Sequence, residues 1–178
     1  AMTQGPTSTD APSASFEETL AEAQELLDRD PSAALKLAES LVRLKNDPRV
    51  FRLAAAACRK LGYKADAEGA ELGGIQAGLE EPEMKRAALA EAEGNSAEAV
   101  QIARQFLEAN PDDLLALTVI GEGLANLWEL EEAEETFRTI LERAPTFLRA
   151  STLLANCRGF DGKDLSSRKF TPDCSFEI

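Results

Sequence analysis

The stretch FLEANPDDLLAL (Phe106–Leu117) has a near copy further along the chain, ILERAPTFLRAS (Ile140–Ser151). In both, an apolar pair is followed by charged residues, a proline and a new apolar run that ends near an alanine. The two prolines, Pro111 and Pro145, are 34 positions apart. Repetition at a fixed interval of about 20–50 residues is typical of proteins built from tandem structural units. We therefore expect an array of repeated units.

One complete unit begins at Leu114. Its apolar side chains recur at intervals of three and four residues, which is the spacing of one face of a helix. A second run of this kind follows after a short turn, so the unit predicts two helices that cover each other's apolar faces. Gly121 is the small residue at which the two helices approach closely, and Pro145 ends the unit because proline cannot continue a helix. The residues of the two apolar faces are Leu117, Ile120, Leu124, Ala133, Phe137 and Ile140.

This layout resembles the tetratricopeptide repeat (TPR), a helix–turn–helix unit of about 34 residues. The unit departs from the family at Trp128, which stands where a turn glycine is usual, and at Ile140, which replaces a common alanine. The resemblance implies an all-α fold, a right-handed superhelical array of antiparallel helix pairs in which the first helix of each pair lines a concave groove. The residues that carry it are Gly121, Ala133, Phe137 and Pro145.

Looser copies of the unit precede it. Gly62 and Gly94 both stand at turn positions, but they are 32 rather than 34 residues apart, so one connection is shortened. Ser15 and Glu18 have the spacing of a capping box at the start of the first helix. The alternative is a compact helical bundle in which the similarity between segments 34 residues apart is accidental. The expected helices cover residues 16–28, 31–45, 48–60, 64–78, 81–93, 95–109, 112–127, 130–143 and 146–158.

Three regions are expected along the chain. Residues 1–14 are polar, lack the apolar core of a signal peptide and begin with an apparent expression scar, so we expect them to be disordered. Residues 15–158 form the repeat array, about four and a half units. The last helix lacks a partner, which would expose Leu153, Leu154 and Cys157. The apolar segment 159–178 is expected to fold back as a cap, with a short helix near 164–170; docking into a neighbouring molecule and disorder are the alternatives.

The composition excludes several classes of partner. Acidic residues outnumber basic ones, 32 to 19, which gives a net charge of −13. Such a surface repels phosphate backbones and anionic lipids, so we expect no nucleic-acid and no membrane partner. Cys58, Cys157 and Cys174 show no close pairing, which favours reduced thiols in a cytoplasmic protein.

Catalytic chemistry is not indicated. The sequence has no histidine, which is the commonest general base and metal ligand, and no GxSxG or Walker motif. Gly73, Gly74 and Gly78 follow a helical run rather than a strand, so they are interpreted as packing positions and not as a phosphate-binding loop. The carboxylates are scattered over helix surfaces without ligand spacing. We expect no enzymatic activity, no metal and no cofactor.

The TPR resemblance also implies a binding surface, because positions 2, 5, 9 and 12 of each first helix face the groove in that family. The arginines near both ends and the apolar centre suit a protein or peptide partner with apolar anchors and some negative charge. Alternatively, the arginines only offset an acidic surface. The Lys, Arg and Asn clamp with which some family members bind acidic chaperone termini is missing. The residues taken as the peptide-binding groove are Arg49, Arg52, Met84, Leu115, Thr118, Arg149 and Asn156, and the same positions include Glu81, Ala88, Glu91, Glu122 and Ala125.

Two other functions are compatible with the sequence besides an interaction scaffold. Residues 16–158 resemble the N-terminal repeat region of bacterial proteins that carry a sulfotransferase domain after the repeats. That resemblance implies a catalytic domain absent from this chain, since nothing after Gly159 resembles a phosphosulfate-binding loop. The third interpretation is a dimerisation module, with a homodimer formed through the open C-terminal face.

Overall fold

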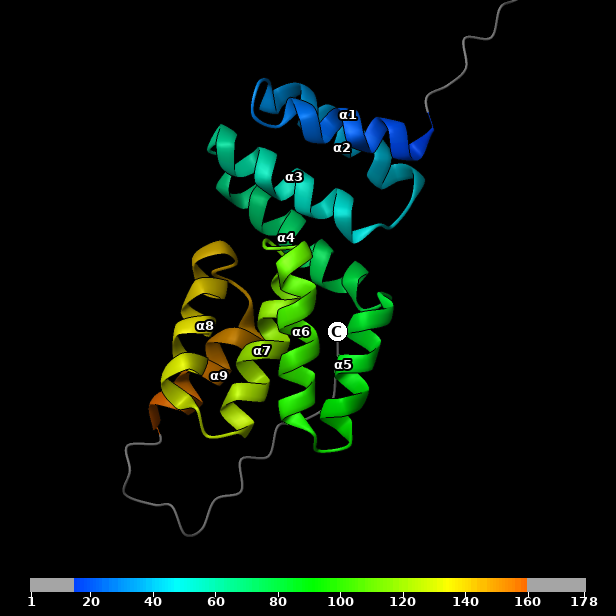
Figure 1. The fold of residues 1–178 in the computed structure, drawn as a ribbon. Helices are drawn as coiled ribbons and strands as arrows, with labels where there is room; N and C mark the ends of the chain where they lie inside the picture. The colour runs from blue at the N-terminus through cyan, green and yellow to red at the C-terminus, as the bar shows by residue number, and fades with distance from the viewer. Residues whose placement is uncertain (1–14, 160–178) are drawn as a thin grey trace, which may run out of the picture.

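The computed structural model describes residues 15–159, in which the chain is helical and contains no strand (Figure 1). Every expected helix is present, with bounds within two residues of those expected. Apart from Gly159, the expected disordered segment 1–14 and the expected cap 159–178 lie outside the described residues. The helices are α1 (Phe16–Leu26), α2 (Pro31–Leu44), α3 (Pro48–Leu61), α4 (Lys64–Gly78), α5 (Pro82–Ala92), α6 (Ser96–Ala109), α7 (Leu114–Asn126), α8 (Leu130–Arg143) and α9 (Leu148–Gly159).

Side chains at the helix starts explain why the bounds could be predicted. Ser15 Oγ accepts a hydrogen bond from the backbone N–H of Glu18 at 3.2 Å, and the Glu18 carboxylate accepts one from the backbone N–H of Ser15 at 2.8 Å. The predicted capping box is therefore confirmed. At four other helices an acidic or amide side chain accepts a hydrogen bond from a backbone N–H of the first turn. These N-capping residues are Asp30, Asp47, Asn95 and Asp113.

Three of the turns within helix pairs, α3–α4, α5–α6 and α7–α8, use the left-handed region of backbone space. Gly62 and Gly94, both predicted as turn residues, have φ of +79°. Trp128 stands at the equivalent turn between α7 and α8 with φ of +65°, where a side chain costs roughly 1–2 kcal/mol. Trp128, which stands in place of the usual turn glycine, therefore raises the conformational free energy of this turn.

Glycines inside the helices allow close packing, as the sequence predicts. A Cβ on Gly121 of α7 would lie 2.7 Å from the Phe137 ring of α8, and Phe137 is fully buried. A Cβ on Gly73 of α4 would lie 2.6 Å from the Phe51 ring of α3. Both distances are far inside van der Waals contact, so these glycines set the separation of their helix pairs.

The array is divided into two stacks, a division that the repeat pattern does not predict. Consecutive helices pack on one another except at α4, which packs against α7 and α8 and does not continue the stack onto α5. We call α1–α4 the N-terminal stack and α5–α9 the C-terminal stack. In Figure 1, α1 to α3 run across the view, whereas α5, α6 and α8 run down it. The predicted fold class, an all-α array of antiparallel helix pairs, is confirmed, with this change of direction inside it.

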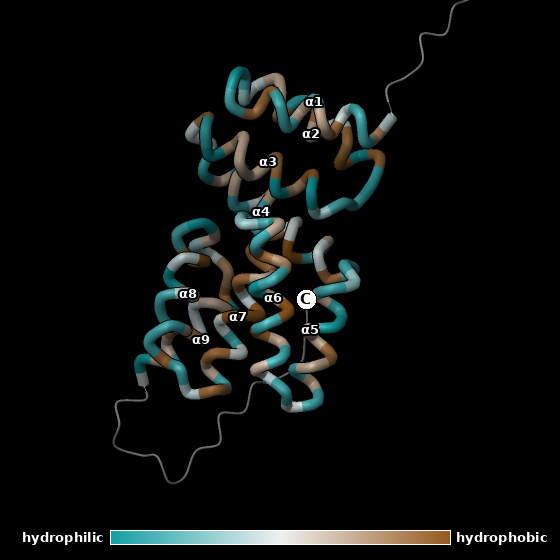
Figure 2. Tube along the Cα trace, viewed as in Figure 1, coloured by the Kyte–Doolittle hydropathy of each residue, from teal (hydrophilic) through white to brown (hydrophobic). Residues whose placement is uncertain are grey.

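Each stack has its own hydrophobic core, and α4 contributes to both. Leu41, Val50 and Leu53 belong to the smaller core of the N-terminal stack, against which Ala70 of α4 packs. One turn later, Ile75 of α4 belongs to the larger core of α5–α9. Figure 2 shows hydrophobic and hydrophilic residues alternating along the helices of both stacks. The helix α4 is thus the apolar link between the stacks.

The last helix is better covered than the sequence suggested. Leu154 and Cys157 are buried by packing of α9 on α8, and Leu153 is half-buried. The expectation that all three are exposed is therefore wrong, and α9 contacts α7 as well as α8. Cys58 is also buried, and burial raises the pKa of both thiols, which agrees with their interpretation as core residues.

Gly121→Ala should destabilise the protein by about 1–3 kcal/mol, because the added methyl group overlaps a buried ring. Gly69→Ala, in the exposed part of α4 where a Cβ meets nothing within 4 Å, is the matched control. It should stabilise by about 0.5–1 kcal/mol through helix propensity. Urea unfolding measures both, and equal effects of the two substitutions would contradict the close approach of α7 and α8.

Candidate functional site

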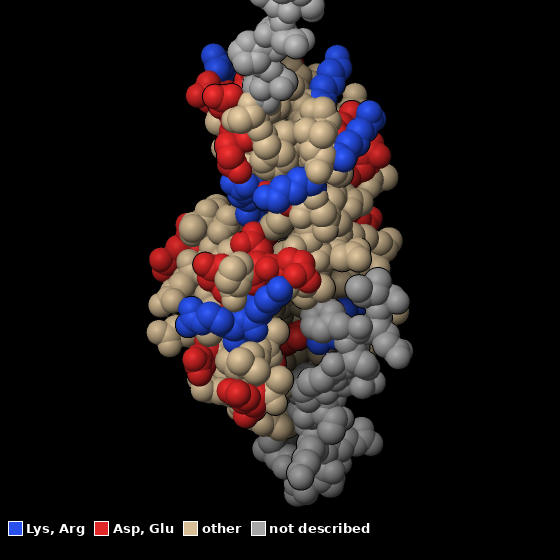
Figure 3. All heavy atoms as spheres, turned by 90° about the vertical axis from the view of Figure 1, so that its right-hand side faces the viewer, with Lys and Arg blue, Asp and Glu red and all other residues tan. Residues whose placement is uncertain are grey.

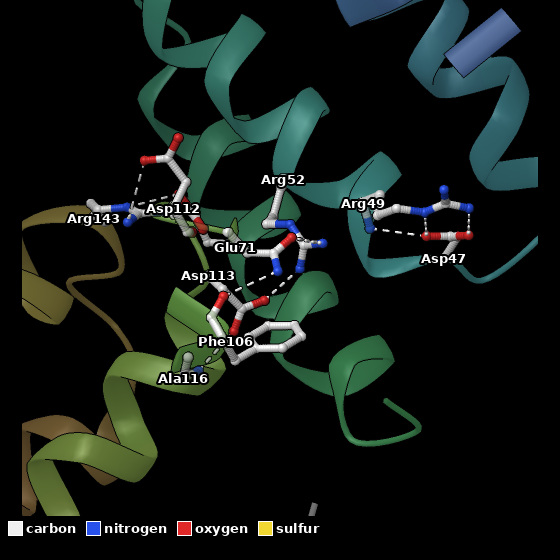
Figure 4. A network of polar contacts seen from close by, with 10 residues as sticks. Asp47, Arg49, Arg52, Glu71, Phe106, Asp112, Asp113, Ala116 and Arg143 are labelled. Atoms are coloured by element: carbon white, nitrogen blue, oxygen red, sulfur yellow. Dashed lines mark hydrogen bonds and ion pairs between the residues drawn. The ribbon is translucent and has the colours of Figure 1, made fainter. Parts of the chain in front are cut away.

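The two stacks are joined by a buried ion pair. The Arg52 guanidinium of α3 donates to Asp113 Oδ2 at 2.6 Å and to Asn110 Oδ1 at 2.9 Å, and it lies over the Phe106 ring (Figure 4). Asp113 is only 3% exposed, and its other oxygen accepts the backbone N–H of Ala116 at 2.7 Å as the N-cap of α7. A single carboxylate therefore starts α7 and holds α3 against it.

A second polar cluster joins α4 to the C-terminal stack. Glu71 of α4 is 4% exposed and accepts hydrogen bonds from Arg143 at 2.7 and 3.0 Å and from Arg59. Burial raises the pKa of Glu71 above its ordinary value, although both arginines act to lower it. Arg143 also donates to the Asp112 carbonyl at 2.5 Å. The stacks are thus tied at two places by arginines, and these contacts fix their relative direction.

Arg52→Ala should destabilise the protein by about 3–5 kcal/mol, because it leaves the buried Asp113 carboxylate without its cation. Arg29→Ala is the control, since Arg29 pairs with Glu25 where both side chains are more than 70% exposed. The control should cost about 0–1 kcal/mol. Chemical unfolding monitored by circular dichroism separates the two, and a similarly small loss for both variants would show that the Arg52 contact does not hold the stacks together.

A cleft of about 780 Å³ lies where the stacks diverge, and we call it the inter-stack cleft. It is bounded by the start of α3, the α4–α5 turn and the end of α6. Figure 3 shows the molecule narrowing here, with basic side chains above the narrowing and acidic side chains below it. Two of the predicted groove residues, Arg49 and Arg52, line this cleft.

Two arginines of the cleft, Arg49 and Arg52, already have acidic partners. Arg49 donates to Asp47 at 2.8 and 3.0 Å and to Glu17 at 2.9 and 3.0 Å, and Arg52 is held by Asp113. Lys45 also pairs with Asp47, at 3.2 Å. These cations stabilise the fold, and their contacts account for them without a ligand.

The Asp47 carboxylate makes this cluster sensitive to pH. Burial alone would raise its pKa, but hydrogen bonds from the Arg49 side chain, the Arg49 backbone N–H and Lys45 outweigh it and lower the pKa from 3.8 to about 2. A pKa that is lower in the folded state gives stability that is present above pH 3.8 and lost as the pH falls towards 2.

Asp47→Asn should therefore cost about 2 kcal/mol at pH 6, a difference that shrinks as the pH falls below the unfolded-state value. Urea unfolding of both proteins at pH 6, 5, 4 and 3 measures the difference. A difference that stayed constant over this range would contradict the lowered pKa.

The second surface is a groove of about 260 Å³ between α5 and α7, closed at one side by Arg149 of α9, and we call it the concave groove. Four predicted residues line it, from three different first helices. Met84, Leu115 and Thr118 are no more than 2% exposed and form its floor, and the Thr118 hydroxyl is committed to the Leu114 carbonyl at 2.7 Å. The accessible walls are Ala88, which occupies a predicted position, and Val119, which was missed.

One end of the concave groove is polar. Glu91 Oε1 accepts hydrogen bonds from Ser96 Oγ at 2.9 Å and from Asn126 Nδ2. Glu91 Oε2 is buried and has no hydrogen-bond partner among the described residues. Glu122 of α7, at the repeat position that Ala88 occupies in α5, pairs with Arg149, and both side chains are mostly buried. Asn126 was missed because it lies outside the four repeat positions that the family pattern supplies.

The structure therefore does not bring the predicted site together as one surface. Arg49 and Arg52 lie in the inter-stack cleft, and Met84, Leu115, Thr118 and Arg149 lie in the concave groove. Asn156 is exposed on α9 and lines neither. The cause is the change of direction at α4, which takes α3 out of line with the first helices α5, α7 and α9.

Over residues 15–159, no helix combines the length and the apolar character that crossing a membrane would require. The same residues contain no group of three or more carboxylate or cysteine side chains placed to hold a metal ion.

No family model and no curated protein matches the chain. Several solved structures match the chain, at low sequence identity. A MamA protein from Desulfovibrio magneticus RS-1 is 18% identical, with a TM-score of 0.42 over 81% of this chain and 84% of that one. YrrB, described as a TPR protein with an unusual peptide-binding site, is 17% identical, with a TM-score of 0.43 over 82% and 77%. A TPR protein from Parabacteroides merdae is 21% identical, with a TM-score of 0.40 over 81% and 60%.

The chain's own helix pairs define its class of fold. Antiparallel pairs follow one another, the turn glycines have positive φ, and glycines inside helices set the closest contacts. The fold is a TPR-like α-solenoid with a change of direction at α4.

Proposed function

We propose that the protein is a non-enzymatic interaction scaffold that binds a peptide or helix of another protein in the concave groove. The observation that carries the proposal is the groove itself, in which three first helices present an apolar floor and a fixed polar end. A narrow apolar groove on rigid helices is a common way to bind one face of a helix or an extended segment. The accessible wall residues Ala88 and Val119 are the apolar contacts offered to the partner.

The charge of the chain supports a protein partner. A net charge of −13 disfavours nucleic acid and anionic membranes, and the absence of histidine removes the commonest catalytic base. We therefore propose a protein partner and no catalytic or cofactor role for this chain, and we retain the cytoplasm as the proposed location. The resemblance to sulfotransferase-associated repeats stays a prediction.

The homodimer has less support than the sequence suggested. It was motivated by an open apolar face on the last helix, but Leu154 and Cys157 are buried in the structure. A monomeric array that uses the concave groove is the simpler proposal.

The proposal is tested with Ala88→Arg, which places a long charged side chain in the accessible wall of the groove. Leu89→Arg, on the next residue of α5 and outside the groove, is the matched control because it adds the same charge at an exposed site. Peptides selected from a random display library on the wild-type protein should lose at least roughly tenfold in affinity for Ala88→Arg. They should keep their affinity for Leu89→Arg, and both variants should fold. Equal binding to the two variants would refute the groove as the binding site.

A further inference from the structure

The concave groove contains a carboxylate whose charge is not compensated by a cation. Glu122 is neutralised by Arg149, but no described Lys or Arg forms an ion pair with Glu91. The hydrogen bonds to Glu91 come from a hydroxyl and an amide, both neutral. The groove end at Glu91 is therefore negative, and it adjoins the apolar floor at Leu115.

This arrangement is energetically unusual. Nearly all buried polar atoms in folded proteins have a hydrogen-bond partner, and an unpaired one costs free energy. Glu91 Oε2 is the buried side-chain atom without a partner in the described part of the chain. Gly123 of α7 lies close by, since a Cβ there would lie 3.8 Å from Glu91 Oε2 and would overlap the Val100 side chain. The carboxylate is held in place by its neighbours although its charge is left unbalanced.

The neighbouring groups do not supply the missing positive charge. The Asn126 amide donates to Glu91, and the Thr118 hydroxyl donates to a backbone carbonyl. The carbonyl oxygen of Asn126 adds a further acceptor beside the carboxylate. A partner that brings a donor with positive charge complements this end of the groove, and a low-dielectric groove strengthens the attraction.

We infer that the concave groove binds a protein segment in which an Arg or Lys follows closely on an apolar side chain. The apolar side chain lies against the walls at Ala88 and Val119, and the cation lies at the Glu91 end. This inference rests on the proposed function and names the chemistry of its partner. It reverses the preference for negative charge that Arg49 and Arg52 suggested, because those arginines already pair with carboxylates of the chain.

Parallel selections from one random peptide library test the inference, with the wild-type protein, Glu91→Gln and Glu93→Gln as baits. Glu91→Gln removes the charge but keeps an oxygen that accepts from Ser96 and Asn126. Glu93→Gln makes the same change two residues away on an exposed site outside the groove. Peptides that the groove-blocking Ala88→Arg variant no longer binds should be enriched in Arg and Lys for wild type and Glu93→Gln. For Glu91→Gln the enrichment should disappear.

The tightest wild-type peptide is then compared with a copy in which its Arg is replaced by citrulline, which is neutral and nearly isosteric. The Arg peptide should bind wild type at least roughly fivefold more tightly, and this ratio should fall to about one on Glu91→Gln. Groove-dependent peptides without basic enrichment, or with acidic enrichment, would overturn the inference and leave the proposed function standing. A selection that yields no peptide sensitive to Ala88→Arg would overturn both.

Discussion

The arrangement of this protein depends on one carboxylate, Asp113. It caps the first turn of α7 through the Ala116 N–H and, with its second oxygen, holds Arg52 of α3 at 2.6 Å. The first contact is local and follows from the sequence, whereas the second joins helices 61 residues apart. Because the carboxylate is almost fully buried, the two contacts depend on each other: displacing Arg52 would leave the α7 cap charged and unpaired. These two contacts of Asp113 therefore set the direction of the N-terminal stack relative to the C-terminal stack.

That change of direction decides which side chains are available for binding. In an uninterrupted solenoid, α3 would extend the groove formed by α5, α7 and α9, and its arginines would be offered to a partner. Here α4 packs on α7 and α8, and Arg52 is paired with Asp113 of the C-terminal stack, whereas Arg49 pairs with Asp47 and Glu17 inside the N-terminal stack. The groove is shorter as a result, and Glu91 becomes its dominant uncompensated charge. The electrostatic character of the binding surface therefore follows from the packing of one helix outside it.

Much of the fold could be predicted from sequence because it is encoded locally. The capping box at Ser15, the turn glycine at Gly62 and the packing glycine at Gly121 each act within one helix pair, and all three were recognised. The change of direction at α4 could not be predicted, since the pattern of apolar residues states that a face is buried but not which helix covers it. Prediction of the candidate site was limited in the same way. Repeat positions indicated α5, α7 and α9 and Ala88, all of which line the concave groove, but they did not separate the floor residues Met84 and Leu115 from accessible ones.

Because α4 packs in both hydrophobic cores, it also affects how the molecule responds to a pulling force. In a regular solenoid each unit contacts only its neighbours, so units detach one after another from an end. A force on the N-terminus of this chain can peel α1 and α2 from the smaller core, but α3 is anchored by Arg52 to Asp113, and α4 is anchored by Ile75 in the larger core and by Glu71 to Arg143 of α8. Extension would stop at α3 until these contacts gave way. The chain thus has a compliant arm of two helices on a stiffer body, and the proposed binding groove belongs to the body.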